Sequence, residues 1–188
     1  MQPARFIPRY TYADYLLWEG DWELIDGIPH ARERGVKAMS PSAGGKHQWL
    51  ASLLTTEIVI SLRQNHKQCR HCMSVQDVDW KIDDNTVLRP DLAIVCLPLV
   101  NDYIVNPPTL IVEILSPSSG HRDRVIKHEI YEAQGVRYYI IANPLSATYT
   151  VYQLIDNKYQ EYTTNTFEIH ADCIIKIDIA KVLEEAVK

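Results

Sequence analysis

The sequence lacks the features that mark membrane, exported and disulfide-stabilised proteins. No uninterrupted apolar stretch approaches the ~18–20 residues that span a bilayer. The first five residues lack the apolar core of a secretory signal. Four cysteines in a chain of 188 residues do not make a disulfide scaffold. These absences predict a cytoplasmic protein with free thiols, one domain over residues 1–188, and no membrane partner.

One cysteine pair invites a metal or redox interpretation. Cys69 and Cys72 form a Cys-x-x-Cys motif, whose two thiolates can bind one metal ion. A structural zinc site usually has four ligands, however, and no second pair follows. Redox motifs of this kind usually sit at a strand-to-helix turn, whereas this one leads into the strand-like stretch 73–75. The pattern therefore favours an ordinary strand start.

Positive charge is also in short supply. There are 24 acidic and 19 basic side chains, which give a formal net charge of −5 at neutral pH. This balance argues against a chain that coats nucleic acid by charge alone, while it allows a local basic groove. The sequence has no glycine-rich phosphate loop, no Gly-x-Ser-x-Gly motif and no His-Glu-x-x-His motif. Function must therefore come from a site that the fold assembles.

The spacing of apolar residues predicts both helices and strands. Asp26-Gly27 between two apolar stretches is the signal of a tight β-hairpin. Helices are expected over residues 11–18, 46–62, 122–134 and 179–187. Strands are expected over residues 22–25, 28–31, 72–75, 78–82, 92–97, 109–115, 138–142, 148–154 and 159–163. This order predicts an α/β fold with a mixed central β-sheet flanked by helices.

The most informative residue is Glu113. It lies inside the apolar run 110–115, which is typical of a central strand buried on both faces. A carboxylate in such a strand costs several kcal/mol unless it is paired or bound to a metal. Its partner is expected to be either a basic side chain or a divalent cation, which takes oxygen ligands from carboxylates.

A second carboxylate lies at the mouth of another strand. Asp91 follows Arg89-Pro90 and directly precedes the apolar stretch 92–97. Proline is tolerated at the first position of a strand. Alone, Asp91 would be interpreted as a turn or capping residue. If its strand pairs with the strand of Glu113, however, the two carboxylates converge at one end of the sheet and form a candidate metal pair.

The helix predicted after Ser119 adds a lysine to the candidate site. Asp123 and Lys127 are four residues apart and share one face, beside an apolar stripe. The pair is either a surface ion pair or a device that brings the Lys127 ammonium to the carboxylates, where it could orient water or stabilise a transition state. Glu23 in the hairpin, His47 at the start of the long helix, and Asp123 are second-tier candidates for the site.

Several of these motifs occur together, and in order, in a known family. They are Trp22-Glu23-Leu24-Ile25-Asp26-Gly27, Met39-Ser40-Pro41 followed by His47, Pro90-Asp91, the segment 112–119, Asp123, Lys127, Tyr131, Gly135-Val136 and Tyr138-Tyr139. Over residues 10–145 the chain resembles the Uma-two family of endonucleases, which is similar to the restriction-endonuclease-like, PD-(D/E)xK fold. The resemblance implies that Asp91 and Glu113 hold Mg²⁺ or Mn²⁺.

The resemblance also implies an activity. The usual pattern has a lysine two residues after the second acid, where this chain has Leu115, and the family is thought to supply Lys127 from the following helix instead. The implied function is metal-dependent hydrolysis of DNA, with DNA as partner and a homodimer as the expected assembly. Two alternatives stay open: a non-catalytic nucleic-acid- or protein-binding module with a structural Glu113–Lys127 ion pair, and a glycosidase that uses Asp91 and Glu113.

Overall fold

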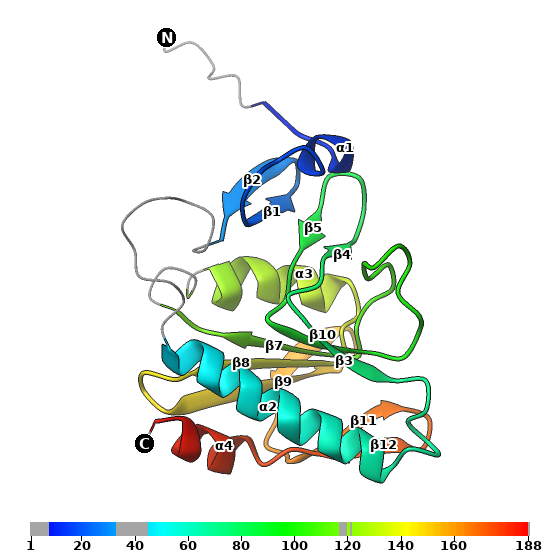
Figure 1. Cartoon of the computed structure of the whole chain (residues 1–188), viewed down its shortest axis with the longest axis vertical. Helices are drawn as coiled ribbons and strands as arrows, with labels where there is room; N and C mark the ends of the chain where they lie inside the picture. Colours follow the sequence, from blue (N-terminus) through cyan, green and yellow to red (C-terminus); the bar gives the residue numbers. More distant parts are fainter. Residues whose placement is uncertain (1–7, 33–44, 117–119, 121, 188) are drawn as a thin grey trace.

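A six-stranded mixed sheet forms the centre of the molecule (Figure 1). The computed structural model describes residues 8–32, 45–116, 120 and 122–187, so motif residues 39–41 and 117–119 lie outside the described residues. Strands β7 and β8 pair in parallel and the other neighbours pair antiparallel. The strand order is β10 (Lys158–Glu161), β9 (Thr148–Ile155), β8 (Tyr138–Asn143), β7 (Leu110–Ile114), β6 (Leu92–Val95) and β3 (Met73–Gln76).

Helices cover both faces of this sheet. Helices α2 (Gly45–Gln64) and α4 (Ile179–Ala186) pack on one face, and η1 (Arg122–Lys127) with α3 (His128–Ala133) lies on the other (Figure 1). Side chains alternate between the two faces along β7, which lets the strand pack against helices on both sides. Val112 packs into the core with α2, and Ile111 packs into the core with α3. The predicted α/β class is thereby confirmed. In the described parts of the chain, no helix has the length and apolar character needed to cross a membrane.

A smaller sheet stands above the helix η1–α3 in Figure 1. Its order is β2 (Ile28–Ala31), β1 (Trp22–Ile25), β5 (Val87–Leu88) and β4 (Trp80–Lys81), and α1 (Tyr12–Tyr15) packs on it. The predicted hairpin of β1 and β2 is confirmed, with Asp26 and Gly27 at φ of 50° and 75°. Sequence periodicity missed β5, because two residues show no alternation. It also missed the hairpin of β11 (Thr166–His170) and β12 (Cys173–Lys176).

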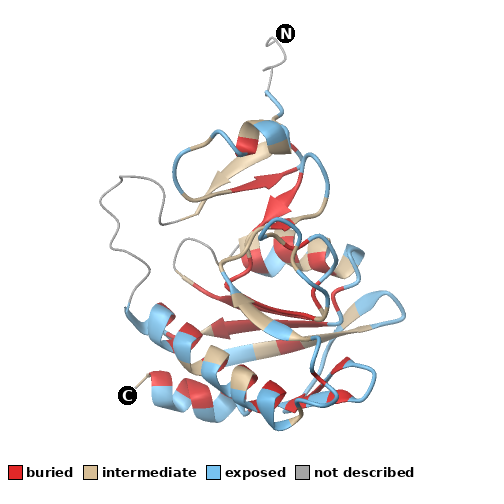
Figure 2. Ribbon diagram, turned by 45° about the vertical axis from the view of Figure 1, so that its right-hand side comes forward, coloured by how far each residue is buried: buried red, intermediate tan, exposed pale blue. Residues whose placement is uncertain are grey.

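The helix expected over residues 122–134 is divided in two. Its first part, η1, is π-helical, and it continues as α3 up to Gly135, which has a φ of 79°. Single π-helical turns inside helices occur frequently at functional sites. Here the turn carries Asp123 and Lys127, and both side chains are buried. Figure 2 shows buried positions along the central strands and both buried and exposed positions along the helices.

The expectation of free thiols is wrong for this structure. Cys69 is bonded to Cys173 and Cys72 to Cys96, so neither cysteine of the Cys-x-x-Cys motif pairs with the other. The register of β3 against β6 sets Met73 opposite Val95, so one residue further along Cys72 meets Cys96. The hairpin of β11 and β12 brings Cys173 to the turn after α2. Both pairings depend on strand positions that residue spacing alone does not reveal.

Replacing Gly27 tests the hairpin turn. Gly27→Ala should lower the free energy of unfolding by about 1–2 kcal/mol, because an L-residue is strained at positive φ. The added Cβ would also lie 3.0 Å from Arg9 Cβ and 3.2 Å from the carbonyl oxygen of Tyr10. Gly45→Ala is the matched control, because no atom of the described residues lies within 4 Å of its new Cβ, apart from its chain neighbours and the backbone of its own helix. Urea unfolding measures both variants, and equal stabilities would contradict the prediction.

Candidate active site

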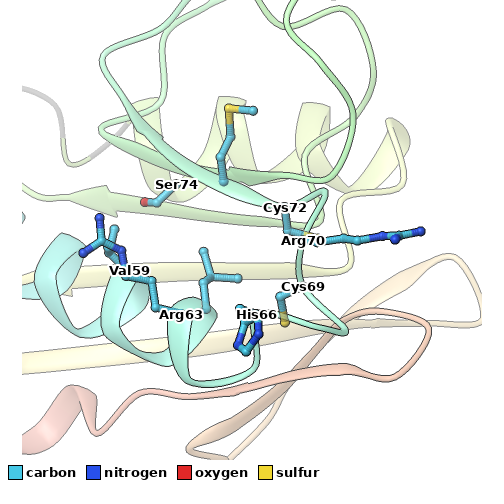
Figure 3. A pocket seen from close by; sticks show the side chains of 9 residues that line it. Val59, Arg63, His66, Cys69, Arg70, Cys72 and Ser74 are labelled. Carbon is cyan, nitrogen blue, oxygen red and sulfur yellow. The ribbon is translucent and has the colours of Figure 1, made fainter.

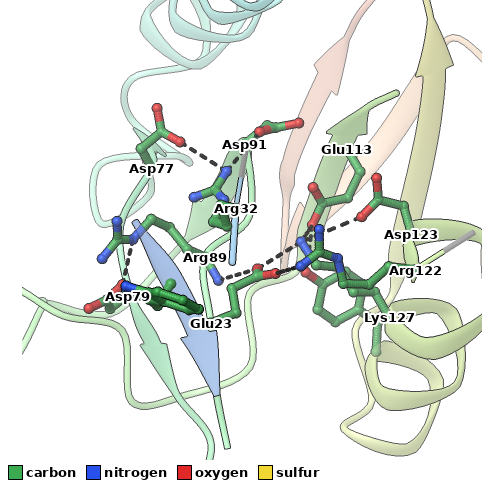
Figure 4. A network of polar contacts seen from close by, with 12 residues as sticks. Glu23, Arg32, Asp77, Asp79, Arg89, Asp91, Glu113, Arg122, Asp123 and Lys127 are labelled. Carbon is green, nitrogen blue, oxygen red and sulfur yellow. Dashed lines mark hydrogen bonds and ion pairs between the residues drawn. The ribbon is translucent and has the colours of Figure 1, made fainter. Parts of the chain in front are cut away.

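Five charged side chains meet where the small sheet adjoins the central sheet (Figure 4). Asp91 is 8% exposed and the other four are only 1–2% exposed. We call the four acids among them the carboxylate cluster. The five come from β1, the residue before β6, β7 and η1: Glu23, Asp91, Glu113, Asp123 and Lys127. The structure therefore brings together the three predicted catalytic residues and two of the second-tier candidates.

Strand pairing brings the two predicted metal ligands to one end of the sheet. Leu92 of β6 lies opposite Val112 of β7, so one residue further along Asp91 lies opposite Glu113. The backbone N–H of Ile114 donates a hydrogen bond of 2.7 Å to Oδ2 of Asp91. Antiparallel register and a backbone donor thus hold Asp91 beside the strand that carries Glu113.

Lys127 lies at the centre of the carboxylate cluster. Its Nζ is 2.8 Å from Oε1 of Glu23, 2.9 Å from Oε1 of Glu113 and 3.6 Å from Oδ1 of Asp123. Burial opposes the charge of the ammonium, but these three carboxylates outweigh it and raise the pKa of Lys127. The Asp123–Lys127 pair is therefore a buried contact within the cluster and not a surface ion pair.

Glu113 has an environment that disfavours its charge. Burial on both faces of the sheet raises the pKa of Glu113 to about 8, although Lys127 acts in the opposite direction. The neighbouring acids Asp123 and Asp91 add to the rise by repulsion. The hydroxyl of Tyr131 donates a hydrogen bond of 2.7 Å to the same Oε1 that Lys127 contacts. Glu113 thus readily carries a proton at neutral pH, whereas the pKa values of Glu23 and Asp91 are lowered.

Asp91 has the opposite environment, although it is nearly as buried. Burial would raise the pKa of Asp91, but the hydrogen bond from His47 and the charges of His47, Arg32 and Lys127 lower it below its usual value. Nε2 of His47 lies 3.3 Å from Oδ2 of Asp91. His47 therefore reaches the site from the first turn of α2, as a partner of Asp91. The roles predicted for these residues stay predictions.

Sequence reasoning missed Arg32 as a site residue. Its Nη2 lies 3.1 Å from Oδ1 of Asp91 and 3.2 Å from Oδ1 of Asp77. The carboxylates of Glu23 and Asp91 raise its pKa, although burial alone would lower it. Arg32 directly follows β2, so the β1–β2 hairpin carries both Glu23 and Arg32 to the site. The predicted hairpin was a signal that could have found it.

The acids of the site match a divalent cation in the type of donor atom they offer. Carboxylate oxygens are the ligands that Mg²⁺ prefers, and one or two of them usually suffice beside water and substrate phosphate. Among the described residues, Oε2 of Glu23 is buried without a hydrogen-bond partner, and burial together with the neighbouring acids raises the pKa of Glu113. Within the described residues, no group of three or more His, Cys, Asp or Glu side chains is arranged to hold a metal. The pair Asp91 and Glu113 still fits such an ion in chemical type, because water and substrate can supply its other ligands. In this structure Lys127 and Arg32 supply the positive charge beside these acids.

Comparison with known proteins identifies the family and the fold. The model of the Uma2 (Uma-two) family, described as "Putative restriction endonuclease", matches residues 12–173. No curated protein matches the chain at a significant level. The chain is similar to the crystal structure of a "putative nuclease belonging to DUF820" from Anabaena variabilis, with a TM-score of 0.67 and 16% identity over 95% of this chain and 99% of that chain. At this identity, the likeness supports the fold.

A second solved structure is similar in part. It is a chain of the DrdV–DNA complex, with a TM-score of 0.31 and 11% identity. The alignment covers 76% of this chain but 14% of that chain. At this TM-score the likeness supports no statement about fold or function.

The pKa of Glu113 predicts how stability depends on pH. The folded state holds a proton that the unfolded chain releases, so the free energy of unfolding should fall from about pH 4.5 to about pH 8. Glu113→Gln keeps an acceptor for Lys127 and Tyr131 but does not titrate, so this decline should be smaller. The lowered pKa values of Glu23 and Asp91 change the free energy of unfolding only below this pH range. Urea unfolding across the range checks the prediction, and equal slopes for the two proteins would contradict it.

Proposed function

The chain belongs to the Uma2 family, and on this premise we propose that it is a metal-dependent endonuclease that hydrolyses DNA phosphodiester bonds. The observation that carries the proposal is the burial of Asp91 and Glu113 at one end of the sheet, with Lys127 2.9 Å from Glu113. Acids of this kind beside a lysine can hold a cation and stabilise developing negative charge. The family description supports the nuclease class, and the residue roles are our proposal.

Asp91 and Glu113 are the residues that would hold Mg²⁺ or Mn²⁺. When bound, such an ion polarises a phosphoryl oxygen and makes water a better nucleophile at neutral pH. Asp91 is kept ionised by His47 and Arg32, so it offers a negative charge without first losing a proton. Glu113 must release its proton to act as a ligand, and the Tyr131 hydroxyl fixes the orientation of its Oε1.

Lys127 is the residue that would assist the reaction directly. Its ammonium is held between Glu113 and Glu23, so its position is set before substrate arrives. A preorganised cation in a buried site stabilises developing negative charge at the phosphorus more strongly than one in water. Glu23 acts as a positioning residue for Lys127. Arg122 helps to hold Glu23 in place, because its Nη1 lies 3.6 Å from Oε2 of Glu23.

One observation favours a second candidate function. Nζ of Lys127 lies 2.9 Å from Oε1 of Glu113, a buried contact that a non-catalytic binding module would keep for stability. In such a module, removal of one partner would cost about 3–5 kcal/mol, and no metal would bind. The two candidates therefore differ in metal binding, and the next two experiments separate them.

Metal binding should release a proton from Glu113. Calorimetric titration of Mn²⁺ at pH 7, in two buffers of different ionisation enthalpy, measures the protons released. The wild type should release close to one, because the pKa of Glu113 is about 8. Glu113→Gln should bind Mn²⁺ more weakly and release none. A wild type that binds no Mn²⁺ would favour the non-catalytic module.

Cleavage should depend on the same residues. Wild-type protein with Mg²⁺ or Mn²⁺ should nick supercoiled plasmid, and Asp91→Asn or Glu113→Gln should abolish nicking. Lys127→Met should lower the rate by about 10²–10³-fold, the usual loss for one electrostatic donor. Glu129→Gln is the matched control, because this exposed acid lies in the neighbouring α3. Nicking that survives Glu113→Gln would overturn the assignment.

A further inference from the structure

Basic side chains are concentrated at the C-terminal end of α2 and in the turn after it. No Asp or Glu occurs between Glu57 and Asp77 in the sequence. Five basic side chains in this interval are exposed: Arg63, His66, Lys67, Arg70 and His71. Within the described segments, none of the five forms an ion pair with a carboxylate, because the ion pairs there involve other cations. On a chain with a net charge of −5, this is a local positive surface.

Three of these side chains line a pocket. It has a volume of about 310 Å³ and lies between the end of α2 and β3 (Figure 3). Arg63, His66 and Arg70 line it, and none of the described residues that line it is acidic. Val59 and Leu62 contribute apolar surface. The pocket therefore offers hydrogen-bond donors and positive charge without a competing carboxylate.

One wall of the pocket holds an unsatisfied polar group. Oγ of Ser74 is buried and has no hydrogen-bond partner in the described parts of the chain. Ser74 faces α2, because Gln76, two residues further along β3, donates a hydrogen bond to Thr55 of that helix. An unpaired buried hydroxyl costs about 1–3 kcal/mol. A ligand oxygen in the pocket would remove this cost.

We propose that this pocket binds a phosphate group of the DNA backbone, away from the phosphate that reacts. Guanidinium groups match phosphate oxygens in geometry, and the Ser74 hydroxyl and the His66 ring add donors. The inference rests on the proposed function, because DNA is the substrate assumed there. It assigns a positioning role to this pocket, since backbone contacts fix the register of a protein on DNA without reading bases.

The length of α2 sets the spacing of the two sites. His47, which contacts Asp91, and Arg63 are on this helix, and at ~1.5 Å per residue they are about 24 Å apart along its axis. At ~3.4 Å per nucleotide, this spacing corresponds to roughly seven nucleotides along one strand. A duplex that lies along α2 is therefore long enough over about seven base pairs to extend from the carboxylate cluster to the pocket.

A pair of matched single substitutions tests the pocket. Arg63→Gln and Lys181→Gln each remove one exposed helical charge, but Lys181 lies on α4 and does not line the pocket. Anisotropy of a labelled duplex, with Ca²⁺ in place of Mg²⁺, measures affinity over a range of salt concentrations. Arg63→Gln should bind about tenfold more weakly, and its slope of log K against log salt should be smaller by about 0.9. Ser74→Ala should weaken binding without changing the slope, and Lys181→Gln should match the wild type.

The outcomes separate this inference from the proposed function. Wild-type cleavage with unchanged binding by Arg63→Gln would overturn the pocket and leave the endonuclease intact. A wild type that neither binds nor cleaves DNA would overturn the endonuclease and the DNA contact together. The unfolding temperature with inorganic phosphate in EDTA then decides whether a site for free phosphate remains. Stabilisation of the wild type but not of Arg63→Gln supports such a site, and no stabilisation overturns it.

Discussion

The contact of Lys127 with the carboxylate cluster is the interaction on which the rest of the site depends. This ammonium touches Glu23 of the small sheet and Glu113 of the central sheet from a helix that packs between them. Each acid is nearly inaccessible to water, so an unpaired charge at either position would be costly. The contact of Lys127 Nζ with Oε1 of Glu23 and Oε1 of Glu113 therefore links the two sheets and also fixes the positions of these side chains in the site.

Asp91 and Glu113 show how neighbouring acids acquire different properties. Both lie at one end of the central sheet, yet the pKa of Asp91 is lowered and that of Glu113 is raised. Burial raises the pKa of both acids, but Asp91 accepts a hydrogen bond from a backbone N–H and contacts His47 and Arg32, which lower its pKa. A site built this way keeps one permanent negative charge and one that can be gained when a cation binds. Such a division reduces repulsion between the acids in the absence of a cation.

Helix α2 connects the two functional regions that we propose. Its first turn supplies His47 to the carboxylate cluster, and its last turn supplies Arg63 to the basic pocket. The apolar side of the helix packs on the central sheet, so its length and direction are set by the core. The chain as a whole is acidic, and it concentrates exposed positive charge where a phosphate backbone would be held.

Local patterns in the sequence determined the hairpin at Asp26-Gly27, the burial of Glu113 in an apolar strand, and the four-residue spacing of Asp123 and Lys127. Each depends on neighbouring residues, so periodicity and turn chemistry suffice. Only the tertiary structure decided that Arg32 contacts Asp91, that Cys72 meets Cys96, and that Ser74 lies beside Arg63. These contacts depend on strand register and on helix packing between distant segments. The sequence therefore identified the acids of the site, whereas the tertiary structure determined which residues contact them.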